Sequence, residues 1–192
     1  MKKKALVIVA HPDDETIWMG GFILLQPEID WTIFSLCRAS DSDRRPKFLR
    51  ACRHFKAKPI IADLPDDGKL DSRRLISRIK KIIPLELGAR TGFTYVFTHG
   101  KNGEYGHIIH QAVHQAVKSL IKEKKIMAET AFGFNYKKNR RPAAKAHSDL
   151  EVNLSAEEFK NKKNVMTEIY GFDPAGVDAN YCTNPEAFKI IF

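Results

Sequence analysis

The sequence contains no long hydrophobic run. Its apolar stretches fall well short of the roughly 20 residues that a helix needs to cross a bilayer, so no membrane span is expected. The lysines after Met1 resemble the start of a secretion signal, but the apolar segment that follows them, Ala5–Ala10, is too short for one. The sequence therefore predicts a cytoplasmic protein.

Cysteine is scarce and irregularly placed. Cys37, Cys52 and Cys182 are odd in number and widely separated, and no two of them have the spacing of a zinc knuckle or a redox motif. This argues against a disulfide framework and fits a reducing compartment. We interpret Cys37 and Cys52 as small core residues rather than reactive thiols.

Repeats, low-complexity tracts and interdomain linkers are also absent. A chain of 192 residues, 43% of them hydrophobic, is long and apolar enough for one domain with a sizeable core. A disordered protein would contain fewer aromatic and branched apolar residues. We therefore treat residues 1–192 as a single domain.

Negative charge is outnumbered. There are 23 Asp and Glu residues against 32 Lys and Arg residues, and the net charge of +9 favours anionic partners. The one dense basic cluster, Lys137–Arg141, could bind a phosphate or an acidic substrate, but we interpret it as a flexible loop. The chain lacks the interleaved basic and aromatic residues of single-strand binders and any recognised DNA-binding pattern, so no nucleic-acid partner is expected.

Strand and helix signals alternate through the first two thirds of the chain. A continuous apolar run is typical of a parallel strand buried on both faces. Four strand–helix units in succession predict an α/β fold with an open, mostly parallel sheet and helices on both faces. The expected strands are Leu6–Ala10, Trp31–Cys37, Pro59–Ala62 and Tyr95–Thr98, and the expected helices are Glu15–Leu25, Asp43–Phe55, Ser72–Ile83 and His107–Lys122.

The pattern weakens beyond Ala128. Phe132–Tyr136 and Leu150–Leu154 are interpreted as late strands. The segment Ser155–Tyr170 opens with the Ser-x-x-Glu spacing of a capping box and predicts the last long helix.

Polar clusters follow the first and fourth expected strands. His11–Glu15, which reads His-Pro-Asp-Asp-Glu, comes directly after the first strand, and His99–His110 comes directly after the fourth. Ligands of open parallel sheets bind outside the carboxyl ends of the strands, so the clusters converge if these strands are neighbours. Imidazole and carboxylate together are the ligands expected of catalytic zinc.

Each cluster also has a plain structural interpretation. Pro12–Glu15 suits the start of any helix, where carboxylates accept backbone N–H bonds and oppose the dipole. The histidines of the second cluster could be polar residues on the wet face of an amphipathic helix. Their joint occurrence is more specific. His11, Asp14 and His110 supply three protein ligands and leave one position open, as catalytic zinc requires.

The two clusters carry a family resemblance. Ala10–Glu15 resembles the signature of the PIG-L/LmbE-like family of zinc-dependent N-acetylglucosamine deacetylases, and Thr98–His110 is similar to that family's second motif. The alternating pattern from Leu6 to about Val117 fits the family's Rossmann-like fold. The resemblance implies an enzyme with Zn²⁺, or alternatively Fe²⁺ or Co²⁺, that acts on a small, possibly anionic amino sugar or glycoconjugate. The oligomeric state stays open, a homo-oligomer included.

The resemblance also implies a role for each site residue. It makes His11, Asp14 and His110 the metal ligands. Asp13 becomes the general base, which takes a proton from the attacking water and returns it to the leaving amine. A protonated His107 faces the negative charge that develops on the oxygen.

Two further residues are expected to bind substrate. Arg45 falls where the family often carries an arginine that meets sugar hydroxyls or an anionic aglycone, and Asp67 falls near a loop carboxylate that holds sugar hydroxyls. Alternatively, Arg45 is a solvated helix residue and Asp67 only a turn former. His114 lies further along the helix and is interpreted as structural.

The chain departs from the family pattern in places. Ile108 and Ile109 stand where relatives often have Pro-Asp, which removes a carboxylate that could orient His107 and raise its basicity. Phe48 also stands where a carboxylate is common. The metal site survives these changes, so metal-assisted removal of an N-acetyl group is the leading hypothesis. The alternatives are an amidase for a bulkier sugar–thiol conjugate and a non-catalytic polyanion-binding protein.

Overall fold

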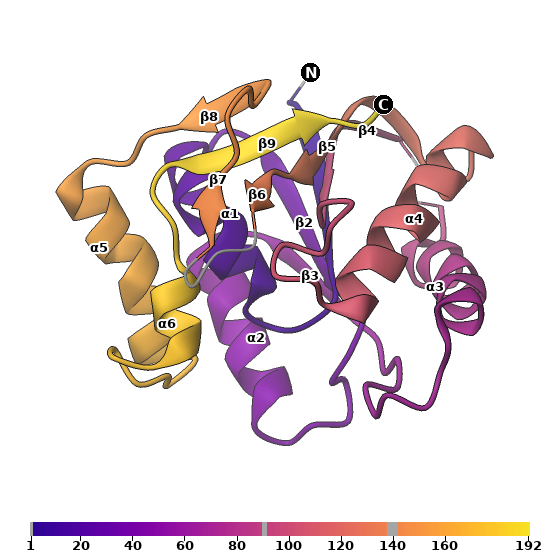
Figure 1. The fold of residues 1–192 in the computed structure, drawn as a ribbon, viewed down its shortest axis with the longest axis horizontal. Coiled ribbons are helices and arrows are strands. Elements are labelled where there is room, and N and C mark those ends of the chain that lie inside the picture. The colour runs from indigo at the N-terminus through magenta and orange to yellow at the C-terminus, as the bar shows by residue number, and fades with distance from the viewer. Residues whose placement is uncertain (1, 90–91, 138–141) are drawn as a thin grey trace.

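The computed structural model describes residues 2–89, 92–137 and 142–192, and a seven-stranded sheet runs through its centre (Figure 1). The strands of the sheet are β1 (Lys4–Val9), β2 (Asp30–Ser35), β3 (Lys58–Ile61), β4 (Gly92–Thr98), β5 (Met127–Phe134), β8 (Leu150–Val152) and β9 (Glu186–Ile190). Their order is β3-β2-β1-β4-β5-β9-β8. The first five in this order run parallel, whereas β9 is antiparallel to both β5 and β8. The mostly parallel α/β fold predicted from the sequence is confirmed.

Helices cover both faces of this sheet (Figure 1). They are α1 (Asp14–Leu25), α2 (Arg44–His54), α3 (Ser72–Leu87), α4 (Ile108–Lys122), α5 (Ala156–Asn164), the π-helical turn η1 (Val165–Ile169) and α6 (Val177–Tyr181). α1, α2 and η1 pack on one face, and α3 and α4 on the other. A short hairpin of β6 (Tyr136–Lys137) and β7 (Ala143–Ala144) pairs apart from the main sheet.

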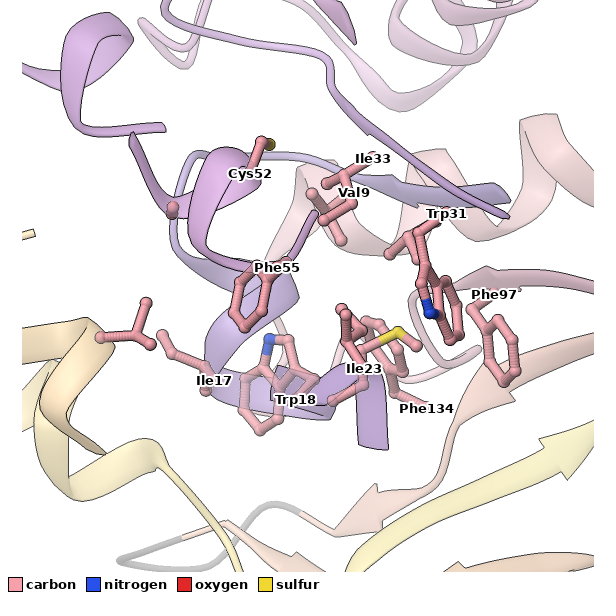
Figure 2. Close-up of a cluster of buried hydrophobic side chains, with 14 of the residues drawn as sticks. Val9, Ile17, Trp18, Ile23, Trp31, Ile33, Cys52, Phe55, Phe97 and Phe134 are labelled. Atoms are coloured by element: carbon pink, nitrogen blue, oxygen red, sulfur yellow. The ribbon is translucent and has the colours of Figure 1, made fainter. Parts of the chain in front are cut away.

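The sequence of β1 explains why helices lie on both faces. Successive side chains of a strand point to opposite faces, and β1 is apolar at every position from Ala5 to Val9. Its odd-numbered residues join the core with α1 and α2, and its even-numbered residues join the core with α3 and α4. The first of these cores contains Trp18, Trp31 and Phe97 (Figure 2). Each large apolar side chain buried there contributes about 1.5–3 kcal/mol.

Helix α1 is kinked at Met19, whose φ of −153° is not helical. Just after the kink, the backbone N–H groups of Gly21 and Phe22 donate to the carboxylate of Glu186, at 2.9 and 2.6 Å. Glu186 is fully buried and pairs with the equally buried Lys162 at 2.8 Å. The last strand of the sheet is thereby joined to the helix that begins at the first polar cluster.

Several elements differ from expectation. Helix α3 continues past Ile83, where it was expected to end, and its additional turn buries Leu87 in the core. The capping box at Ser155 is confirmed, but the expected helix is divided into α5 and the wider turn η1. The sequence indicated neither α6 nor β9, because both are short and carry charged residues beside apolar ones.

Three smaller expectations can be compared with the structure. Cys37 and Cys52 are buried and free, as expected of core residues. Among the described residues, no helix is long and apolar enough to cross a membrane. Of the basic cluster Lys137–Arg141, all but its first residue lies outside the described residues.

Candidate metal centre and active site

The two polar clusters meet at the carboxyl ends of β1 and β4. These strands are neighbours, with Ile8 opposite Thr98, so the residues that follow them leave the sheet side by side. β1 pairs with β2 on its other edge, and the connections after β1 and after β3 cover opposite faces. This reversal is the kind of place where open parallel sheets bind ligands.

His11, Asp14 and His110 direct three ligand atoms toward one point. Oδ2 of Asp14 lies 3.4 Å from Nδ1 of His11 and 3.4 Å from Nε2 of His110. Ligand atoms of a tetrahedral zinc ion, each about 2.0–2.1 Å from the metal, are about 3.3 Å apart. Nε2 of His110 is also buried without a hydrogen-bond partner in the described part of the chain. The donor set therefore fits a divalent metal ion.

Asp14 is fixed in place by two further bonds. Its Oδ2 accepts the backbone N–H of His11 at 2.9 Å, and its Oδ1 accepts the indole N–H of Trp18 at 3.1 Å. Burial opposes the negative charge, but His110 and His99 outweigh it and hold the pKa of Asp14 well below its usual range. The group is ionised, as a metal ligand must be.

Glu104 supports His110 from behind. Its Oε2 lies 2.7 Å from Nδ1 of His110 and 2.9 Å from Nδ1 of His99, and its Oε1 accepts the N–H of Gly100 at 2.6 Å. Burial opposes its charge, but the two histidines lower the pKa of Glu104 to about 2. An ionised carboxylate only accepts, so both Nδ1 atoms carry hydrogen. His110 therefore presents the lone pair of Nε2 toward Asp14.

His99 stacks on His110, with ring centroids 3.7 Å apart, but does not have a free nitrogen. Its Nε2 accepts the backbone N–H of Ala10 at 2.9 Å, and its Nδ1 donates to Glu104. The carbonyl of His99 in turn accepts Nδ1–H of His114 at 2.9 Å, which agrees with a structural role for that residue. His99 thus connects the ends of β1 and β4 rather than binding a ligand.

Asp13 lies beside the ligand cluster, which consists of His11, Asp14 and His110, and its backbone is strained. Its φ of 119° is in a region that favours glycine, and such strain costs about 1–3 kcal/mol. Nη1 of Arg44 donates to its Oδ2 at 2.8 Å. Burial and the charge of Asp14 raise the pKa of Asp13 well above its usual value, while Arg44 acts in the opposite direction. A carboxyl group with a raised pKa is suited to exchanging protons near neutral pH.

His107 precedes the first turn of α4, with its ring centroid 4.6 Å from that of His110 and 5.2 Å from that of His11. Burial and these two neighbours lower the pKa of His107 to about 4. This lowered pKa disfavours the protonated His107 that was expected. Ile109, at the position where a carboxylate is common, packs into the core and offers nothing that would raise this pKa. In its neutral form His107 would act as an N–H donor.

The second nitrogen of His11 contacts another carboxylate. Nε2 lies 3.1 Å from Oδ2 of Asp66, which also accepts from Nη2 of Arg38 at 3.1 Å. Burial disfavours a charged His11, but Asp14 and Asp66 outweigh the burial and raise its pKa to about 12. Asp66 therefore fixes the orientation of the ring, with Nδ1 toward Asp14, in the way that carboxylates orient metal-bound histidines.

A cavity of about 270 Å³ opens beside this cluster. Four of the expected site residues line it: His11, Asp13, Asp14 and His107. The remaining lining residues are Pro12, Ile17, Arg38, Arg44, Asp66, Tyr105, Asp178 and Tyr181.

Neither residue expected to bind substrate lines the cavity, but the residue that precedes each of them does. Arg45 is exposed and does not line the cavity, whereas Arg44 does. Asp67 is exposed and pairs with Lys69 at 2.9 Å, whereas Asp66 reaches the cavity. Adjacent residues on a helix point about 100° apart, so the sequence identified the segment but not which arginine faces the site.

Comparison with known proteins agrees with this geometry. The family GlcNAc-PI de-N-acetylase (PIG-L) matches residues 6–121, more than half of the chain. The chain belongs to this family. The match contains every residue of the ligand cluster, together with Asp13, Glu104 and His107.

Solved structures share the fold of this PIG-L protein. N,N'-diacetylchitobiose deacetylase from Pyrococcus horikoshii has a TM-score of 0.69 and 15% identity, over 98% of this chain and 84% of that one. A deacetylase from the biosynthesis pathway of teicoplanin has a TM-score of 0.67 and 13% identity, over 88% and 84%. GalB, the 4-carboxy-2-hydroxymuconate hydratase from Pseudomonas putida, has a TM-score of 0.63 and 15% identity, over 99% and 96%. Since one fold carries both kinds of reaction, function must be argued from the site.

Sequence reasoning missed several residues of the PIG-L site. His99 and Glu104 stand inside the recognised second motif, and the need of a metal-bound histidine for a carboxylate partner was a usable signal for Glu104. Asp178 and Tyr181 come from α6, beyond the matched region, and no motif marks them. Their place in the cavity follows only from the folded chain.

Proposed function

We propose that this PIG-L family member is a metal-dependent N-deacetylase that hydrolyses the acetamide of an N-acetylglucosamine-type amino sugar or glycoconjugate. The proposal depends on one observation: a carboxylate, that of Asp13, lines the same cavity as two residues of a three-ligand centre. The description of the family and the names of two similar structures are in keeping with it.

The ligand set favours zinc, with Fe²⁺ and Co²⁺ as alternatives. His11 and His110 would hold the ion through Nδ1 and Nε2, and Asp14 through Oδ2. A bound ion of this kind polarises an amide carbonyl and lowers the pKa of water. Because Glu104 and Asp66 already fix the two rings, little reorganisation is needed on binding.

Asp13 is the proton acceptor and donor. It takes a proton from the attacking water and delivers it to the amide nitrogen as the carbon–nitrogen bond breaks, so that acetate and a free amine leave. The 2.8 Å bond from Arg44 holds its carboxylate at the edge of the cavity. The neutral His107 donates an N–H hydrogen bond to the carbonyl oxygen, on which negative charge develops.

The size of the cavity favours a short acyl group. At about 270 Å³ it lies just below the range of about 300–1,000 Å³ that is usual for drug-sized ligands. One sugar ring with an acetyl group suits this volume better than the bulkier acyl group of a sugar–thiol conjugate. Substrates with acetyl and with larger acyl groups should therefore be hydrolysed at clearly different rates.

The decisive experiment replaces the base and keeps the metal. Wild type, Asp13→Asn and the control Asp67→Asn would be compared by elemental analysis and by acetate release from N-acetylglucosamine and its glycosides. We expect all three proteins to bind one metal ion. Asp13→Asn should lose about 10²–10⁴-fold in kcat, the usual contribution of a general base, and Asp67→Asn should be active. Full activity in metal-loaded Asp13→Asn would contradict the mechanism.

A further inference from the structure

The segment after α5 packs against the first polar cluster although it lies outside the matched family region. The hydroxyl of Tyr170 donates to Oε1 of Glu15 at 2.7 Å. The ring of Phe172 lies 4.6 Å from the guanidinium carbon of Arg44, the residue bonded to Asp13. This part of the chain is therefore attached to the site by contacts on two sides of it.

Helix α6 completes this segment and lies against α1 (Figure 1). Asp178 and Tyr181 are three residues apart, so they share one side of the helix, and both line the cavity. Ala179 points the other way and is fully buried. The helix thus presents a carboxylate and an aromatic ring to whatever enters the cavity.

The ring of Tyr181 continues an aromatic wall. Its centroid lies 5.2 Å from that of Tyr105 and 6.4 Å from that of Trp18. The Tyr105 ring is in turn 5.4 Å from the ring of the metal-ligand candidate His110. Aromatic surface therefore extends from the ligand cluster to α6 along one side of the cavity. A tyrosine wall of this kind combines apolar faces with polar hydroxyl tips.

Asp178 differs from the other carboxylates that line the cavity. Asp13 is bonded to Arg44, Asp14 lies among the ligand histidines, and Asp66 is shared by His11 and Arg38. Within residues 2–89, 92–137 and 142–192, the side chain of Asp178 makes no hydrogen bond or ion pair. Asp178 is exposed, so its carboxylate oxygens can accept hydrogen bonds from a ligand in the cavity that it lines.

We propose that α6 recognises the sugar ring of the substrate: Tyr181, with Tyr105, contacts the apolar C–H face of a pyranose, and Asp178 accepts hydrogen bonds from its hydroxyl groups. This inference rests on the proposed function, because it takes the acetamide to react at the ligand cluster while the ring extends toward α6. A hydroxyl donor suits Asp178, whereas an acidic substituent at this position would be repelled by it. A site built to bind a hydroxyl group rejects an analogue without one, so Asp178 gives selectivity for sugars.

Two acetamides test this role. N-acetylglucosamine carries hydroxyl groups, and N-cyclohexylacetamide has a six-membered ring with none. Acetate release from both would be measured for wild type, Asp178→Asn, Tyr181→Ala and the control Asp67→Asn, all loaded with zinc. Asp178→Asn should lower kcat/KM for N-acetylglucosamine by about tenfold or more, as expected for losing hydrogen bonds to a charged group, and leave N-cyclohexylacetamide unchanged. Tyr181→Ala should lower both, and Asp67→Asn neither.

Calorimetric binding of N-acetylglucosamine to the same variants is a readout that does not need turnover. If metal-loaded wild type binds the sugar through Asp178 but releases no acetate, the proposed function fails and the role of α6 stands. An unchanged preference between the two acetamides in Asp178→Asn, or wild-type sugar binding by this variant, would overturn the inference. Should Asp178→Asn lower the melting temperature, Asp178→Glu must restore selectivity for the sugar, because it keeps the carboxylate.

Discussion

Replacing Glu104 by glutamine changes one buried oxygen into an NH₂ group at almost constant shape. Oε2 of Glu104 receives N–H bonds from His110 and His99, and Oε1 receives that of Gly100. An amide retains only one of these two acceptors. Either its NH₂ group faces the N–H of Gly100, or it faces the two imidazoles, whose protons must then move to Nε2.

Both arrangements are unfavourable. The first leaves a buried donor unpaired, at about 1–3 kcal/mol. The second puts a proton on Nε2 of His110, where the metal would bind, and turns Nε2–H of His99 toward the N–H of Ala10. Loss of a carboxylate behind a ligand histidine typically weakens metal binding about 10–100-fold, and we expect a decrease of this size in Glu104→Gln.

The contribution of the Glu104 carboxylate should also be visible in the pH dependence of the unfolding free energy of the metal-free protein. The pKa of Glu104 is about 2, against an ordinary value of 4.5. This difference corresponds to roughly 3 kcal/mol, which the wild type has in full above pH about 4.5 and loses as the pH falls toward 2. The difference in unfolding free energy between wild type and Glu104→Gln should therefore shrink in acid.

The measurements are zinc affinity by competition with a chelator and urea unfolding at several pH values. Glu129→Gln is the matched control, because Glu129 is exposed and makes no side-chain hydrogen bond or ion pair within the described residues. Wild-type zinc affinity in Glu104→Gln would refute the argument that this carboxylate sets the tautomer of His110.

Three other predictions concern different parts of the molecule. Since the pKa of His11 is about 12, metal binding at neutral pH should release about one proton per ion. The calorimetric enthalpy of metal binding should then vary with the ionisation enthalpy of the buffer. Equal heats in all buffers would contradict this prediction. Lys162→Met leaves the negative charge of Glu186 buried without a counter-ion and should cost about 3–5 kcal/mol in urea unfolding. Wild-type stability of this variant would show that the ion pair is unimportant. Arg44→Gln removes a charged hydrogen bond to Asp13 and should lower kcat/KM about 10-fold or more. The control Arg45→Gln should have no effect. Equal effects of the two substitutions would show that the cavity-facing arginine is misassigned.

Much of the fold and the ligand cluster could be predicted because the signals are local. A continuous apolar strand, a turn and a helix start recur along the chain, and one rule about open sheets brings His11, Asp14 and His110 together. These conclusions depend on residue types at short spacing. They needed no knowledge of side-chain orientation.

The features of the site that could not be predicted depend on which way a side chain points and on contacts between residues far apart in the sequence. Whether Asp66 or Asp67 faces the cavity is decided by one residue of loop geometry. The lowered pKa of His107 follows from burial and from two neighbouring rings, which only the folded chain brings together. Helix α6 is too short for periodicity to reveal it.

The kink in α1 has a consequence for how the protein is made. Two N–H groups in the middle of this helix donate to Glu186, more than 160 residues later along the chain. During synthesis we expect these two bonds to form only after the last strand of the sheet has left the ribosome. We expect metal loading to follow translation rather than accompany it, and a fragment limited to residues 6–121 to bind zinc poorly even though it carries every ligand.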